Sequence, residues 1–180
     1  MKDTKKLVMM ALGIAINVVL GTVVSYLKIP FLYLDTLGTV YIVALFGPLA
    51  AAIVGFITNV VIAITTGSAA SVAFGIVNIV VGVISGLIFK KYGVNYITGF
   101  IVGIILAFVA PMIGTPISLL IYGGLDFNAT DIMKVYINKL VDNFALSVYS
   151  TKVLSNLIDK VLTALIAVLI YLKTKRVFDE

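Results

Sequence analysis

Long apolar runs alternate with short polar gaps along the chain, and most of the runs have the length of a membrane-spanning helix. Such a helix needs about 20 predominantly apolar residues, within a range of roughly 17–25. The apolar runs cover residues 7–27, 34–46, 49–65, 72–89, 96–122 and 153–172. We therefore predict an all-α integral membrane protein in which six transmembrane helices form a single domain over residues 1–180.

The second and third runs meet at Gly47-Pro48, a dipeptide typical of a turn. The second run is short for a bilayer, which indicates either a tilted helix buried among its neighbours or an interrupted one. The same residues are also compatible with one long re-entrant unit.

A longer polar segment, residues 125–152, separates the fifth and sixth runs. Ile132, Val135, Tyr136 and Leu140 recur within it at helical spacing, with polar residues between them. The residues 128–130 provide side chains that could cap the start of this helix. We interpret the segment as an amphipathic outer helix or lid. A seventh span is the alternative, but it would place the two termini on opposite sides of the membrane.

The charged residues divide unequally between the two ends of the predicted bundle. The termini and the gap at 89–96 hold Lys2, Lys5, Lys6, Lys90, Lys91, Lys173, Lys175 and Arg176 against Asp3, Asp179 and Glu180, a net charge of +5. The other end holds Lys28, Lys134, Lys139, Lys152 and Lys160 against Asp35, Asp126, Asp131, Asp142 and Asp159, a net charge of 0. Because cytoplasmic loops retain Lys and Arg, we expect both termini inside and an even number of spans.

Composition excludes several classes of function. Hydrophobic residues make up 62% of the chain and charged residues 12%, against roughly 25% charged in soluble domains. The chain has no Cys and no His, so it lacks a thiolate nucleophile, the commonest metal ligand and the usual general base. We expect no catalytic residues, no metal and no cofactor, and the basic balance suits anionic lipid rather than nucleic acid.

Polar residues inside the apolar runs gather at one depth near the outer surface. Lys152, Asn156, Asp159, Lys160 and Thr163 share one face at the start of the sixth run. Asn59 and Asn78 each lie ~9 Å below the outer surface, and Ser118 and Tyr122 lie near the outer end of the fifth run. Such groups are costly in lipid, so we predict a ligand pocket that opens outward. The candidate substrate-binding residues are Asn59, Asn78, Ser118, Tyr122, Asn156, Asp159 and Lys160.

Each of these residues also has a purely structural interpretation. Asp159 and Lys160 could form an interfacial pair that reaches to the headgroups, and each Asn could make a hydrogen bond between helices. Asp159 and Lys160 are adjacent, about 100° apart on a helix, so both need not face a ligand. Of the two, Asp159 is our first candidate for ligand contact.

The first run contains a pattern of small residues, Ala11-Leu-Gly-Ile-Ala15. Small residues let two helix backbones approach closely in a membrane. Ala11 and Ala15 therefore mark either a docking face for a partner helix or a contact with another helix of the same chain.

The order and spacing of these motifs resemble those of the substrate-binding S components of energy-coupling factor (ECF) transporters, in particular the riboflavin and pyridoxine-type branches. The resemblance covers nearly the whole chain. It rests on the alanine motif at 11–15, Pro30-Phe-Leu-Tyr-Leu-Asp35 followed by Leu45-Phe-Gly-Pro-Leu49, Val77-Asn78 with Gly82 and Gly86, and Asn156-Leu-Ile-Asp159-Lys160.

The resemblance implies a multi-pass protein of a prokaryotic cell membrane that captures a vitamin or vitamin precursor outside the cell. It also implies docking, through Ala11 and Ala15, on a transmembrane coupling subunit that works with two cytoplasmic ATPases. The absence of Trp argues against a thiamine ligand, and the absence of His argues against nickel or cobalt. A planar vitamin such as riboflavin, or pyridoxine and related pyrimidines, stays open, with Tyr33, Tyr122, Tyr136 and Phe74 as candidates for ring stacking.

Two other classes remain as alternatives. The chain could be a small secondary carrier that works as a homo-oligomer without ATPases, or a membrane scaffold without a ligand. Binding by the purified chain separates the three: an S component binds without partners, ions or a gradient, a coupled carrier needs its ion, and a scaffold binds nothing.

The charge asymmetry makes a topology prediction that the cysteine-free chain can test cleanly. Single cysteines introduced as Asp3→Cys, Gly93→Cys and Asp179→Cys should react with a thiol reagent only from inside the cell, and Asp126→Cys only from outside. Labelling of position 126 from inside, or of position 93 from outside, would contradict the predicted topology.

Overall fold

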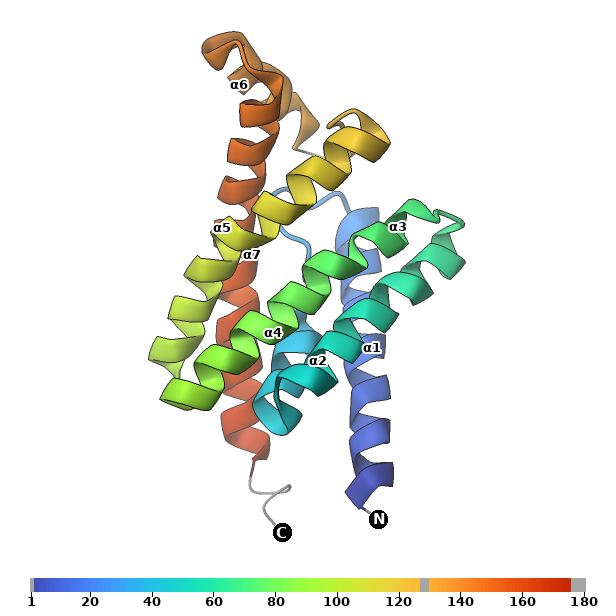
Figure 1. The fold of residues 1–180 in the computed structure, drawn as a ribbon, viewed down its shortest axis with the longest axis vertical. Coiled ribbons are helices and arrows are strands. Elements are labelled where there is room, and N and C mark those ends of the chain that lie inside the picture. Colours follow the sequence, from blue (N-terminus) through green and yellow to red (C-terminus); the bar gives the residue numbers. More distant parts are fainter. Residues whose placement is uncertain (1, 127–129, 176–180) are drawn as a thin grey trace.

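The computed structural model describes residues 2–126 and 130–175, and all regular secondary structure within them is helical (Figure 1). In chain order the helices are α1 (Lys2–Tyr26), α2 (Leu37–Thr66), α3 (Ala70–Ala73), α4 (Gly75–Tyr92), α5 (Tyr96–Tyr122), α6 (Asp131–Val141) and α7 (Phe144–Thr174). Five helical stretches among the described residues are long and apolar enough to cross a membrane: Asp3–Tyr26, Leu37–Thr66, Ala70–Tyr92, Tyr96–Tyr122 and Phe144–Thr174.

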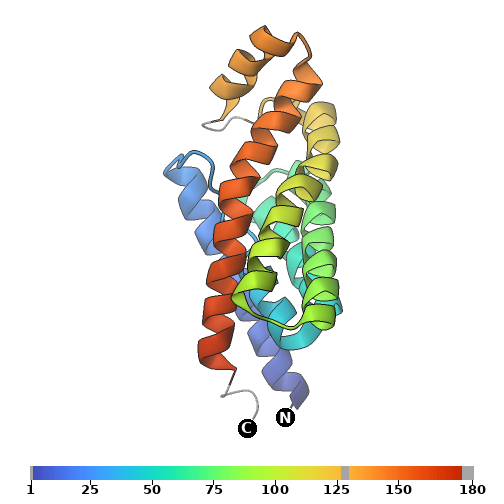
Figure 2. The ribbon, with the colours of Figure 1, turned by 90° about the vertical axis from the view of Figure 1, so that its left-hand side faces the viewer.

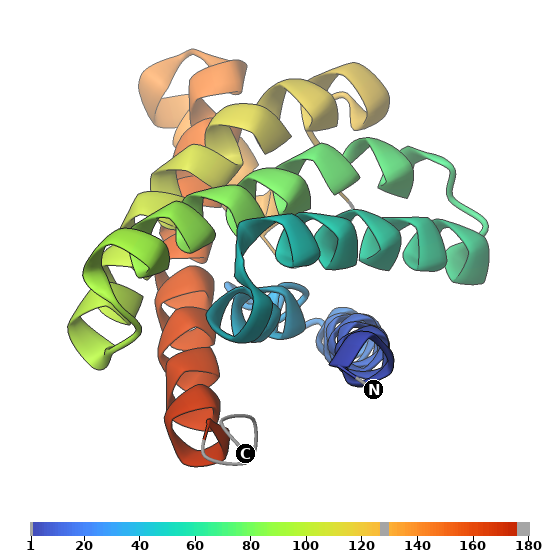
Figure 3. The same cartoon turned by 60° about the horizontal axis from the view of Figure 1, so that its bottom comes forward.

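The predicted second and third spans are two arms of α2. Gly47 interrupts the helix with φ 82° and ψ −175°, a conformation that glycine adopts without a steric penalty, and Pro48 begins the second arm. The chain reverses its direction at this point, so the second arm does not continue along the axis of the first (Figures 1 and 3). The first arm, residues 37–46, is only about 15 Å long at 1.5 Å per residue, half the thickness of the hydrocarbon core. The structure therefore does not establish six full-length spans.

The predicted outer segment 125–152 is correct only in its first half. It contains the amphipathic helix α6, but α7 already begins at Phe144, nine residues before the predicted start of the last span. The Asn143 side chain accepts a hydrogen bond from the Leu146 backbone N–H and so caps α7 at this earlier position. Of the predicted capping residues, Thr130 directly precedes α6, whereas residues 128 and 129 lie outside the described residues.

The bundle is built on the second helix. α2 packs against α1, α4 and α7, while α5 packs against α7. Glycines allow the closest contacts: a side chain at Gly38 would collide with the backbone of Gly13, and a Cβ at Gly55 would lie 2.7 Å from the carbonyl oxygen of Asn78. The apolar core between these helices contains Val40, Ile42, Val54, Val81, Val102, Leu106 and Val168.

Both described chain ends lie at the same end of the bundle, where α4 also ends and α5 begins (Figures 1 and 2). The opposite end carries the connection between α1 and α2, the short helix α3, and α6, which packs on the first turns of α7. The described basic residues of the predicted positive end, among them Lys5, Lys6, Lys90, Lys91, Lys173 and Lys175, thus belong to elements at one end of the bundle, and α6 lies at the other.

Candidate ligand-binding site

A cavity of about 580 Å³ lies in the half of the bundle remote from the chain ends. It is enclosed by the last turns of α1, the connection between α1 and α2, the second arm of α2, α3 and α4, the last turns of α5, and α7. Its polar and aromatic wall includes Tyr26, Lys28, Tyr33, Asp35, Asn59, Phe74, Asn78, Tyr122, Asp126, Lys152, Asn156 and Lys160. Elements far apart in the sequence therefore contribute to one site.

Most of the ligand-binding residues predicted from the sequence come together here. Those that line the cavity are Asn59, Asn78, Tyr122, Asn156 and Lys160. Ser118 lies one contact away, because its hydroxyl donates a hydrogen bond to Asp126, which does line the cavity. The described lining residues do not include Asp159, whose side chain is fully buried beside the α1–α2 connection.

The three asparagines carry hydrogen-bonding capacity that the protein leaves unengaged. Asn78 is 3% exposed, and its carboxamide makes no hydrogen bond with any described residue. Asn59 donates to Gly55 O (3.2 Å) and Asn156 to Lys152 O (2.8 Å), both within their own helices, which leaves their side-chain oxygens open. All three line the cavity, so a ligand there could engage these groups.

Asp159 and Lys160 anchor the α1–α2 connection to α7. The backbone N–H groups of Tyr33 and Leu34 donate to Asp159 Oδ1, each at 2.8 Å. Lys160 Nζ contacts Asp159 Oδ2 (2.7 Å) and donates to Asp35 Oδ1 (3.1 Å) and Thr36 Oγ1 (3.0 Å). The ammonium group thus has one ion-pair contact within α7 and two hydrogen bonds to the α1–α2 connection. The side chains point into the bundle, so an interfacial pair that reaches the headgroups does not describe them.

The anchored connection has a strained backbone. Lys28, Phe31 and Leu34 all have positive φ angles, of 50°, 62° and 51°. Non-glycine residues adopt such angles at a cost of order 1–3 kcal/mol each, and only where the surroundings hold them. The bonds to Asp159 and Lys160 supply that restraint. Burial raises the pKa of Tyr33 in this connection to about 12, so its phenol is neutral at physiological pH.

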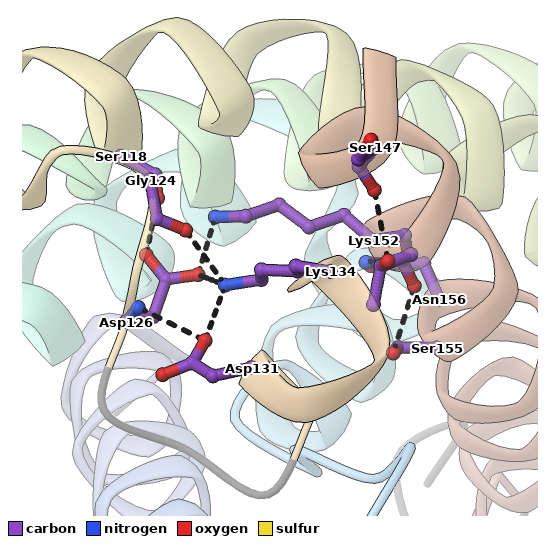
Figure 4. A network of polar contacts seen from close by, with 10 residues as sticks. Ser118, Gly124, Asp126, Asp131, Lys134, Ser147, Lys152, Ser155 and Asn156 are labelled. Atoms are coloured by element: carbon purple, nitrogen blue, oxygen red, sulfur yellow. Dashed lines mark hydrogen bonds and ion pairs between the residues drawn. The ribbon is translucent and has the colours of Figure 1, made fainter. Parts of the chain in front are cut away.

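A second charged network lies at the end of the cavity next to α6 (Figure 4). The fully buried Lys134 of α6 donates to Gly124 O (2.9 Å), Asp126 Oδ2 (2.7 Å) and Asp131 Oδ1 (2.7 Å). Lys152 of α7 reaches the same Asp126 oxygen at 2.9 Å. Burial opposes the ionised form of Asp126, but Lys152, Lys134 and the Ser118 hydroxyl outweigh it and lower its pKa. One carboxylate therefore joins the end of α5, α6 and α7.

Sequence reasoning missed this second network. Asp126, Asp131 and Lys134 stand in a polar gap, where charged side chains are usually solvated. The one available signal was the spacing of Asp131 and Lys134, which places them on neighbouring turns of a helix. That spacing says nothing about burial, which depends on how α6 folds back onto α7.

Aromatic side chains form another part of the wall. The rings of Phe74 and Tyr122 stack with centroids 6.3 Å apart and an interplanar angle of 15°. Lys152 Nζ lies 5.6 Å from the centroid of the Phe74 ring. Tyr33 also lines the cavity, whereas Tyr136 is 64% exposed on α6 and is not among the described lining residues. Three of the four predicted stacking residues are therefore in place.

The alanine motif lies outside the cavity, on the free side of α1. Ala11 and Ala15 are exposed, while Gly13 and Asn17 face α2. Asn17 fixes that packed side: it donates to Thr39 Oγ1 (2.8 Å) and Thr58 Oγ1 (3.1 Å) and accepts from the Gly38 backbone N–H (2.7 Å). The two alanines are thus not used for helix packing among the described residues.

Comparison with known proteins agrees with this architecture. The model of the family "ECF transporter, substrate-specific component" matches residues 5–173. The chain therefore belongs to the family of substrate-specific components of ECF transporters, which are membrane proteins of substrate binding and transport. No curated protein and no solved structure matches the chain.

The anchoring role of Asp159 is testable with Asp159→Asn. Loss of the charge should weaken the two backbone hydrogen bonds by about 1.5–3 kcal/mol, lower the unfolding temperature in detergent by several degrees, and free the α1–α2 connection. A cysteine introduced as Leu32→Cys should then react faster with a thiol reagent.

Asp142→Asn, at an exposed carboxylate just after α6, is the matched control and should change neither measurement. An unchanged labelling rate in Asp159→Asn, together with weaker ligand binding, would instead make Asp159 a ligand contact.

Proposed function

We propose that the chain is a high-affinity, membrane-embedded binding subunit that takes up a vitamin or vitamin precursor from outside the cell. The observation that carries the proposal is the carboxamide of Asn78, which lines a large cavity without a hydrogen bond to any described residue. A membrane protein gains no stability from such a group in the empty state. Its presence is best explained by a ligand that completes its hydrogen bonds.

The size and lining of the cavity favour a small planar molecule. A volume of about 580 Å³ falls within the range of roughly 300–1,000 Å³ that is usual for small-molecule sites. The stacked pair of Phe74 and Tyr122 offers a flat apolar surface, and the asparagines offer directional contacts to ring substituents. These features support a ring-containing vitamin of the riboflavin, pyridoxine or pyrimidine kind.

Energy for uptake would come from partner proteins. The sequence contains no phosphate-binding loop, and family membership supports a module with a transmembrane coupling subunit and two cytoplasmic ATPases. The exposed face of α1 around Ala11 and Ala15 is suited to close contact with a helix of that subunit. In this arrangement both termini are cytoplasmic, and the cavity faces the outside of a prokaryotic cell.

The buried carboxylates favour this proposal over an ion-coupled carrier. A coupled carrier uses intramembrane carboxylates to bind its proton or sodium ion. Here Asp159 is already engaged by two backbone N–H groups and by Lys160. The same carboxylate serves to hold the α1–α2 connection.

The decisive experiment is ligand binding by the purified chain alone. Mass spectrometry of small molecules retained in detergent should identify a vitamin-like compound, and calorimetry should show tight binding without sodium, a pH gradient or partners. Asn78→Ala should weaken binding about 5- to 150-fold and leave the unfolding temperature of the empty protein nearly unchanged, because Asn78 has no partner to lose. Strict dependence on an ion would favour a coupled carrier, and absence of any binding would favour a scaffold.

The docking face is testable by adding bulk to it. Ala15→Trp should abolish cellular uptake while leaving ligand binding by the purified chain intact, because a large side chain prevents close helix contact. Ile101→Trp, at an exposed position of α5 on the far side of the bundle from α1, is the control and should preserve uptake (Figure 3). Equal loss of binding and uptake in Ala15→Trp would contradict the docking role.

A further inference from the structure

One carboxylate oxygen in the wall of the cavity has no partner among the described residues, and this oxygen constrains the chemistry of the ligand. It belongs to Asp35, next to Lys160. The ammonium group of Lys160 forms an ion pair with Asp159 at 2.7 Å and donates hydrogen bonds to Asp35 and Thr36. These contacts hold Asp35 at the wall and leave its second oxygen open.

Acceptors are open on the same part of the wall. Only one oxygen of Asp35 is engaged, by Lys160, and its side chain is 36% exposed at the cavity. The other Asp35 oxygen has no partner among the described residues. Asn156, one turn from Lys160 on α7, has its amide nitrogen engaged by a backbone carbonyl and its oxygen open, and Asn59 has the same arrangement. Each open oxygen can accept a hydrogen bond from the ligand, and the second amide N–H of Asn59 and of Asn156 can donate one.

The charge balance acts in the same direction. Lys160 lies between two carboxylates, Asp35 and Asp159, so this buried cluster has an excess of one negative charge. At the outer end, Lys152 is paired with Asp126, and the network of Lys134, Lys152, Asp126 and Asp131 is neutral. Lys28 also lines the cavity, but its side chain is exposed to solvent at the rim, where its charge is screened.

We propose that the ligand presents N–H donors to Asp35, as a protonated amine or an amino-substituted nitrogen heterocycle does. This inference rests on the proposed binding function and narrows its substrate class. The open carboxylate of Asp35 binds the N–H edge, Asn156 and Asn59 accept further N–H groups, and Asn78 bonds to the ring edge with both donor and acceptor. Lys152, with protons not engaged by Asp126, accommodates a neutral acceptor on the ligand.

The experiment begins with the compound that the detergent-purified full-length chain retains, identified by mass spectrometry after denaturation. We expect a compound with at least one N–H donor, bound at close to one molecule per chain. A retained compound without an N–H donor that binds with the same stoichiometry would overturn the inference and leave the proposed binding function standing. A chain that retains and binds nothing would overturn both.

The role of Asp35 is then measured with the identified compound and its N-methylated derivative. Wild-type protein should bind the methylated compound about 10- to 150-fold more weakly, the usual effect of losing a hydrogen bond to a charged group. Asp35→Asn should bind the parent compound more weakly by a similar factor and should discriminate much less between the two.

Thr36→Val is the matched control, because it removes a neighbouring bond from the same connection to Lys160 and keeps the carboxylate. It should retain the full discrimination between the two compounds. Equal binding of both compounds by wild-type protein would overturn the proposal, and this comparison holds even if Asp35→Asn does not fold.

Discussion

The ion pair of Asp159 and Lys160 inside α7 determines the shape of the site. Charged groups in the interior of a membrane protein are costly unless each has partners, and here each partner belongs to the connection between α1 and α2. The hydrogen bonds that offset the cost of burying this pair therefore also fix the position of the strained, irregular α1–α2 connection. Irregular backbone at this depth is tolerated only where protein groups satisfy its N–H and C=O groups, and Asp159 satisfies two of them.

The charged and the neutral polar groups at the cavity have different surroundings. The ammonium groups of Lys134 and Lys160 contact carboxylates, a hydroxyl and a backbone carbonyl, and they hold α6 and the α1–α2 connection in place. The carboxamides of Asn59, Asn78 and Asn156 are buried but incompletely paired. Charged interactions thus hold the wall of the cavity in place, and neutral carboxamide groups line the cavity. The aromatic pair of Phe74 and Tyr122 completes this inner surface.

Hydropathy and polar spacing predicted much of this arrangement, because both depend on local sequence. The helix over 96–122, the turn at Gly47-Pro48 and the polar face of the last helix all follow from the chain read in one dimension. The sequence did not predict which neighbouring element each polar residue of this helix contacts. Asp159 and Lys160 are adjacent, and only the course of the α1–α2 connection decides that Lys160 reaches the cavity wall while Asp159 binds backbone behind it. The early start of α7 likewise depends on a single capping residue, Asn143.

The sharing of one Asp126 oxygen by Lys134 and Lys152 has a thermodynamic consequence. Lys152 faces the cavity and Lys134 belongs to α6. Because both lysines pair with the same oxygen, a shift of the Asp126 carboxylate changes both ion pairs. A ligand that draws Lys152 towards itself alters the hold on α6, and by reciprocity a displacement of α6 alters the affinity for that ligand by the same free energy. If the cavity binds a ligand as proposed, the position of α6, which contributes Lys134 and Asp131 to the network, is a second variable of that binding equilibrium.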